Sequence, residues 1–151
     1  MMKLDSVEKI LDYAMEKEED AAQFYLTLAG KMDKEYMKKV FEGFAKEEKG
    51  HKAKIQAIKA GKLMLKAEKK VMDLKIGDHL VEVDLDADID YQQALILAMK
   101  AEKAAYKLYS ELASAVDDAG LKETLMALAN EEAKHKLRFE IEYDDIILSE
   151  N

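Results

Sequence analysis

The sequence has no cysteine and no proline, and only six of its 151 residues are glycine. Without cysteine, the chain cannot form disulfide bonds, use a thiol nucleophile or bind zinc or iron–sulfur clusters through thiolates. Proline and glycine interrupt helices, whereas alanine, leucine, methionine, glutamate and lysine, which dominate here, favour them. The composition therefore predicts an all-α protein, and its length predicts a single domain over residues 1–151.

The chain also lacks any apolar run approaching the roughly 20 residues that a membrane span requires. The segment Met1–Lys9 has no apolar core of the kind found in signal peptides, so we expect a cytoplasmic protein that does not enter membranes. The formal net charge is −8. Because phosphate backbones are bound by basic surfaces, nucleic acid is not an expected partner.

An internal repeat relates the two halves of the sequence. The segment Ala98–Tyr109 echoes Ala14–Tyr25, and the same offset relates two Glu-x-x-His motifs. The residues of these motifs are Glu48 and His51 in the first half, and Glu132 and His135 in the second. A duplicated unit of this kind predicts two similar helical hairpins.

Apolar residues recur at steps of four and three within each half, which is the pattern of helices packed in a bundle. Ser6 and Asp90, equivalent under the repeat, stand where helix N-caps are expected. Together these features predict a ferritin-like four-helix bundle with a long crossover between the second and third helices. The expected helices cover about 6–32, 35–62, 90–116 and 119–147, and the crossover, of mixed local structure, covers about 63–89.

Six ionisable residues interrupt the otherwise apolar inward stripes of these helices. They are Glu18, Glu48, His51, Glu102, Glu132 and His135. Buried carboxylates are costly unless they are paired or bound to metal, and no lysine or arginine lies on the stripes. Two divalent cations would balance four glutamates, with two imidazoles completing the ligand set. One glutamate from each of two helices, with Glu-x-x-His from each of the others, is the arrangement of di-iron and di-manganese bundles.

Several neighbouring residues are assigned other roles. Glu47 and Glu131 leave the inward stripe, so we expect them to face solvent or to stand behind the metal ligands. Tyr25 and Tyr109 lie inside the stripe, where a buried phenol needs a partner. We expect each to donate a hydrogen bond to a ligand carboxylate, and a relay of protons or electrons is the alternative. His79 has no repeat equivalent and is expected at the surface.

The helices carry strings that resemble those of the rubrerythrin family. These strings run from Met15 through Tyr25 and from Glu47 to His51. The resemblance implies a non-haem di-iron centre in which Glu48 and Glu132 bridge the two irons. It also implies Glu18 and Glu102 as terminal ligands and one imidazole on each iron. A manganese pair stays open, because the ligand types separate iron from manganese poorly.

Two departures from the family pattern bear on function. Rubrerythrins usually carry a C-terminal rubredoxin domain, whereas this sequence ends at Asn151 without a cysteine. The expected electron donor is therefore a separate rubredoxin-like protein or a small molecule. Peroxide-reducing rubrerythrins also tend to have an extra glutamate one turn after the third-helix glutamate, and Ala105 stands there. This departure argues against peroxidase chemistry of the full rubrerythrin type.

The leading interpretation is a di-iron oxidoreductase that reacts with hydrogen peroxide or dioxygen. A ferroxidase or iron-handling protein, for which Fe(II) is a substrate, is the first alternative. A bundle that binds metal for stability without turnover is the second. Homodimer formation is expected only by analogy with other ferritin-like bundles.

Overall fold

The computed structural model describes residues 7–61 and 88–146, and it contains four α-helices. Their bounds are α1 Val7–Lys31, α2 Glu35–Lys59, α3 Tyr91–Ser114 and α4 Ala119–Ile146. No strand occurs in these two described stretches. The all-α four-helix bundle expected from the sequence is confirmed. The expected cap Ser6, residues 63–87 of the crossover and His79 lie outside the described residues.

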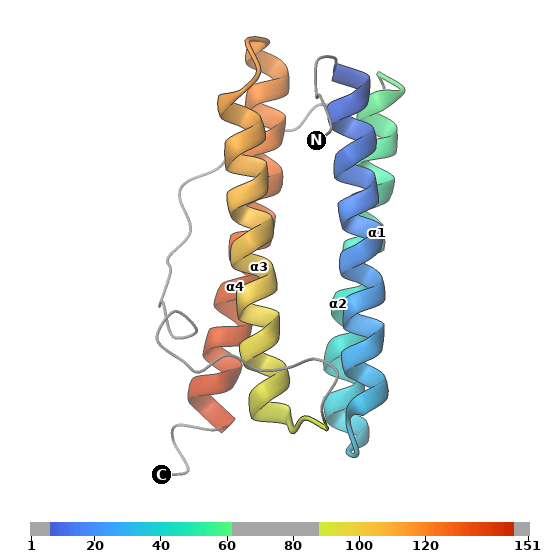
Figure 1. Cartoon of the computed structure of the whole chain (residues 1–151), viewed down its shortest axis with the longest axis vertical. Coiled ribbons are helices and arrows are strands. Elements are labelled where there is room, and N and C mark those ends of the chain that lie inside the picture. The colour runs from blue at the N-terminus through green and yellow to red at the C-terminus, as the bar shows by residue number, and fades with distance from the viewer. Residues whose placement is uncertain (1–6, 62–87, 147–151) are drawn as a thin grey trace.

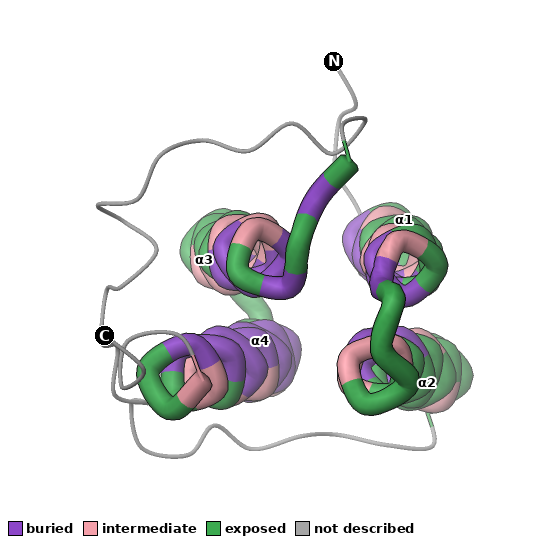
Figure 2. The backbone as a smooth tube through the Cα atoms, turned by 90° about the horizontal axis from the view of Figure 1, so that it is seen from below, coloured by how far each residue is buried: buried purple, intermediate pink, exposed green. Residues whose placement is uncertain are grey.

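The helices form two antiparallel hairpins, α1 with α2 and α3 with α4 (Figure 1). Viewed along the bundle, α1 lies beside α2 and α3, while α4 lies beside α3 and α2 (Figure 2). The end of α2 and the start of α3 stand at opposite ends of the bundle (Figure 1). This placement of the two helix ends is that of the ferritin-like topology.

The helix ends explain where the chain turns. Asp90 caps α3 by accepting a hydrogen bond from the Gln93 backbone N–H at 2.8 Å, while the Gln93 side chain accepts one from the Asp90 N–H at 3.0 Å. This reciprocal capping box confirms the expected role of Asp90. Asp118 similarly accepts a hydrogen bond from the Leu121 N–H at 2.7 Å. At the end of α2, Gly61 adopts a φ of 75°, which L-residues with side chains disfavour.

Two hydrophobic clusters fill the bundle, one toward each end. The cluster around the hairpin end of α1 and α2 contains the aromatic rings of Tyr25, Phe41, Phe44 and Phe139. Its closest ring pair is Phe44 and Phe139, with centroids 4.0 Å apart. The other cluster is aliphatic and rests on Leu11, Ile55, Leu112, Leu125 and Leu128, among others. The ionisable residues of the inward stripes therefore form a layer between two apolar regions.

Within residues 7–61 and 88–146, no helix combines the length and apolar character that a membrane crossing requires.

The capping box at Asp90 predicts a measurable contribution to stability. Replacing Asp90 with alanine removes the acceptor of the Gln93 N–H and should lower the free energy of unfolding by about 1 kcal/mol. Urea denaturation followed by circular dichroism would measure the change. Asp88→Ala, two residues earlier and outside the helix, is the matched control and should leave the midpoint near that of the unchanged chain. Equal stabilities for the two variants would contradict the capping role.

Candidate metal centre

All six ionisable stripe residues meet at the middle of the bundle. Glu18 comes from α1, Glu48 and His51 from α2, Glu102 from α3, and Glu132 and His135 from α4. Each is buried, with no more than 4% of its surface exposed. The i, i+3 spacing of Glu and His on α2 and α4 places both side chains on the same helix face. Four helices thus contribute to a single ionisable layer.

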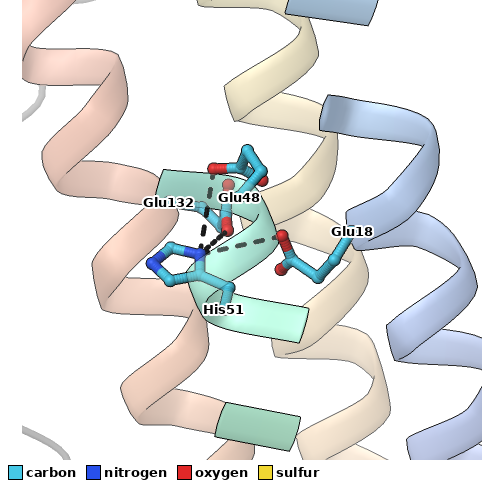
Figure 3. A group of neighbouring side chains, drawn as sticks. All are labelled: Glu18, Glu48, His51 and Glu132. Atoms are coloured by element: carbon cyan, nitrogen blue, oxygen red, sulfur yellow. Dashed lines mark hydrogen bonds and ion pairs between the residues drawn. The ribbon is translucent and has the colours of Figure 1, made fainter. Parts of the chain in front are cut away.

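The six residues divide into two overlapping groups whose ligand atoms lie within 4.8 Å of one another. The first contains Glu18, Glu48, His51 and Glu132, and the second contains Glu48, Glu102, Glu132 and His135. Figure 3 shows the first group, with the carboxylates pointing at one ring nitrogen of His51. Glu48 and Glu132 belong to both groups. The arrangement therefore provides two neighbouring cation sites that share two carboxylates.

The imidazoles turn the same nitrogen inward. His51 Nδ1 lies 3.0 Å from an oxygen of Glu132 and 3.7 Å from one of Glu18. His135 Nδ1 lies 2.8 Å from Glu48 and 3.3 Å from Glu102. The two rings are stacked, with centroids 5.2 Å apart and planes inclined by 7°. Each histidine therefore offers its Nδ1 to the shared carboxylate of the opposite hairpin.

The two buried tyrosines also reach across to the opposite hairpin. Tyr109 on α3 donates a hydrogen bond to Glu18 at 2.6 Å, and Tyr25 on α1 donates one to Glu102. The hydrogen bonds to glutamates that we expected from the sequence are thus present. Because a Tyr hydroxyl fixes one oxygen of each carboxylate, it restricts the rotation of the side chain.

The outward nitrogens of the imidazoles face two acids that sequence reasoning placed outside the ligand set. His51 Nε2 lies 3.8 Å from Glu131, and His135 Nε2 lies 3.8 Å from Glu47. Both acids are partly exposed, and Arg138 forms a two-point ion pair with Glu47 at 2.8 and 3.0 Å. Carboxylates behind histidine ligands stabilise the ring orientation and raise ligand basicity. The sequence offered a signal, because each acid immediately precedes a stripe glutamate in the repeat.

The sequence did not predict a buried ion pair on α4. Lys136 and Glu140 form an ion pair of 3.3 Å on α4, and both side chains are buried. They stand one turn apart, which is the usual spacing of helix ion pairs. Because solvated pairs have the same spacing, the sequence alone gave no sign of their burial.

The hydrogen bonding of the four buried carboxylates is consistent with a metal site. Among the described residues, one buried oxygen on each of Glu18, Glu102 and Glu132 has no hydrogen-bond partner, and the Glu48 oxygen that lies 2.8 Å from His135 Nδ1 forms no well-aligned hydrogen bond. Unsatisfied buried carboxylate oxygens are costly, and a cation satisfies them. Carboxylate oxygens with imidazole nitrogens suit iron, manganese and other first-row metals.

Burial and mutual contacts shift the pKa values of several ionisable residues in the layer. Burial raises the pKa of Glu48 to about 11, and the charge of Glu132 adds to the rise. Burial likewise raises the pKa of Glu102 to about 7 and that of Glu132 well above its usual range. For His51, burial is outweighed by the bonds to Glu132 and Glu18, which raise its pKa to about 10. Without cations, the layer therefore holds protons, which a bound metal would displace.

The fold and the layer define a class, the four-helix bundles with a buried carboxylate and histidine metal centre. The rubrerythrin family model matches residues 9–143, and the chain belongs to the rubrerythrin family. The matched region is the ferritin-like di-iron domain. Comparison with curated proteins and with solved structures found no significant match.

The raised pKa values predict how the stability of the metal-free chain depends on pH. The pH window in which the folded chain binds more protons than the unfolded one runs from 4.5 to about 11 for Glu48 and from 6.5 to about 10 for His51. By linkage, the free energy of unfolding should fall as pH rises through this window, by about 1.4 kcal/mol per pH unit for each extra proton. The lowered pKa of Glu18 acts only below this window.

Urea melts of the metal-free chain between about pH 5 and 9 would measure this slope. Glu48→Gln keeps that position neutral at every pH, so the variant should show a shallower slope than the unchanged chain. Stability that rises with pH, or identical slopes for the two chains, would contradict protonated carboxyls in the layer.

Proposed function

We propose that the chain is a di-iron oxidoreductase that reacts with hydrogen peroxide or dioxygen. The observation that carries the proposal is the pair of overlapping ligand groups, which share Glu48 and Glu132 and contain four buried oxygens that lack a well-formed hydrogen bond. A pair of irons bound there would supply two electrons to an O–O bond and accept its oxygens as a Lewis acid. A manganese pair would fit the same donors.

The residues of the layer have distinct roles in this proposal. Glu48 and Glu132 would contact both ions, whereas Glu18 and Glu102 would each contact one. His51 and His135 would bind through Nδ1, the nitrogen that faces the carboxylates. The apolar clusters on either side exclude water from the layer, which strengthens its electrostatic interactions.

The hydroxyls of the two tyrosines would keep the terminal carboxylates oriented. Tyr109 fixes an oxygen of Glu18, and Tyr25 fixes one of Glu102. The other oxygen of each carboxylate has no hydrogen-bond partner and would be available to bind an ion. Electrons would come from a separate donor such as a rubredoxin-like protein, and dimer formation is a further part of the proposal.

Iron handling is a second candidate, favoured by the exposed acids on the α2 and α4 side. Glu47 and Glu131 each stand beside a buried imidazole and are partly exposed, and they pair with Arg138 and Lys134 respectively. Fe(II) would displace these cations to use the carboxylates as a route into the layer. Release of oxidised iron with growth of mineral would favour this candidate, whereas repeated peroxide reduction at constant bound iron would favour the first.

Because Glu132 belongs to both ligand groups and Glu18 to only one, replacing them should reduce the number of bound ions to different extents. Glu132→Ala removes a donor from both groups and should abolish tight binding of both ions, whereas Glu18→Ala affects only one group and should leave about one ion per chain. Elemental analysis after anaerobic Fe(II) loading would measure the stoichiometry. Glu123→Ala, an exposed acid on α4, is the control and should retain two ions. Full loading of the Glu132 variant would disprove its role as a shared ligand.

The reaction itself would be tested on the chain loaded with two ferrous ions per molecule. We expect stoichiometric hydrogen peroxide to convert it to a diferric form with new near-ultraviolet absorption, followed by stopped-flow spectroscopy. The Glu123→Ala variant should behave identically. Tight binding of two ions with no reaction toward peroxide or dioxygen would support a metal-stabilised bundle and overturn the oxidoreductase proposal.

A further inference from the structure

A groove opens between α1 and α3 and reaches the metal layer from that side. Its volume is about 430 Å³, and its floor is formed by Tyr25, Glu102 and Glu132. A water molecule occupies only about 30 Å³, so hydrogen peroxide would fill a small part of this space. Grooves of this volume are typical of sites for small organic molecules.

The walls of the groove are mainly apolar, and most of the α3 side chains that line it are alanines. Ala21 and Phe24 line it on α1, and Ala101, Ala105 and Leu108 line it on α3. At the mouth, Lys17 and Asp20 carry opposite charges, and the Lys17 ammonium lies 5.3 Å from the centre of the Tyr13 ring. A mouth with both signs of charge gives no net attraction for an ionic ligand, so the lining favours a neutral and mostly apolar one.

The groove breaks the equivalence of the two halves of the repeat. Positions charged or bulky on α1 are small or aliphatic on α3: Lys17 pairs with Ala101, Asp20 with Ala104 and Phe24 with Leu108. The floor likewise contains Glu102 and Tyr25 but not their equivalents Glu18 and Tyr109. The groove therefore leads to the ligand group that contains Glu102 and His135.

We propose that the α1–α3 groove binds the alkyl group of an organic hydroperoxide and directs its O–O group to the Glu102 and Glu132 side of the layer. This inference rests on the proposed function. The O–O bond of the hydroperoxide would break, with two protons taken from solvent and two electrons from the ferrous pair of the proposed function, which becomes diferric. The products would be one alcohol and one water. The alanines make room for the alkyl group, which hydrogen peroxide lacks.

Binding is tested first without metal. The probe is 2-phenyl-2-propanol, the alcohol product of cumene hydroperoxide, titrated into the metal-free chain and followed by the NMR signals of the alanine methyl groups. We expect saturable shifts at Ala21, Ala101 and Ala105. Ala105→Phe fills the groove and should weaken binding at least about tenfold. Ala101→Leu, the second groove variant, should also weaken binding. Ala53→Phe, at an exposed alanine on α2, should bind as the unchanged chain does, and circular dichroism would verify that the variants fold.

The reaction is tested next with the ferrous-loaded chain, comparing cumene hydroperoxide with hydrogen peroxide. Ala105→Phe should lower the rate with cumene hydroperoxide at least about tenfold more than the rate with hydrogen peroxide, and Ala53→Phe should change neither. Absence of saturable alcohol binding, or equal slowing of both oxidants, would overturn the groove assignment. Oxidation by hydrogen peroxide without oxidation by cumene hydroperoxide would overturn only this inference. Failure of both oxidants would instead reject the proposed function.

Discussion

The structure depends on the compensation of negative charge in a buried layer. Four carboxyl groups and two imidazoles meet in the middle of the bundle, and the buried lysine of the described residues, Lys136, forms an ion pair with Glu140. Each ionised carboxylate there has a large desolvation cost, which protons, hydrogen bonds or cations must offset. In the metal-free chain, protons and the histidines do so, as the raised pKa values of Glu48 and His51 indicate. Cations would replace those protons and satisfy the oxygens that have no donor, so metal binding and the stability of the fold are coupled.

The same constraint determines how the hairpins associate. Tyr109 on one hairpin binds Glu18 on the other, and His135 approaches Glu48 in the same way. Their repeat equivalents make the reciprocal contacts. The shortest contacts of Glu18, Glu48, Glu102 and Glu132 therefore come from the opposite hairpin, and separating the two hairpins would remove these partners on both sides. The backbones lie closer together within each hairpin than between hairpins, and the side chains of Tyr25 and Tyr109 form hydrogen bonds from one hairpin to the other. The ionisable layer accordingly acts as a specific polar connection between two apolar clusters.

The sequence was sufficient to predict the helices, the cap at Asp90 and the convergence of the six ionisable residues. These features follow from local periodicity and from the repeat, because equivalent positions on antiparallel helices lie at equal depth. It did not identify which carboxylate each tyrosine would contact, since that depends on which helices become neighbours. It left open whether Glu47 and Glu131 face solvent or stand behind the imidazoles, because the direction of a residue just off a stripe depends on the rotation of its helix. The burial of Lys136 and the groove beside Ala105 likewise depend on tertiary packing.

The two faces of the layer differ in the chemistry that they offer to solvent. On the α2 and α4 side, the imidazoles are flanked by Glu47 and Glu131, and Arg138 lies with its guanidinium 4.3 Å from the centre of the Phe44 ring. On the α1 and α3 side, the approach is an apolar groove that ends at Glu102 and Glu132. The first face presents charged groups of both signs, whereas neutral molecules lose less hydration than ions on entering the second. Duplication alone would produce two equivalent ligand groups. Because Ala101 and Ala104 on α3 stand where α1 has Lys17 and Asp20, the two groups are unequal in access while remaining nearly equivalent in their ligands.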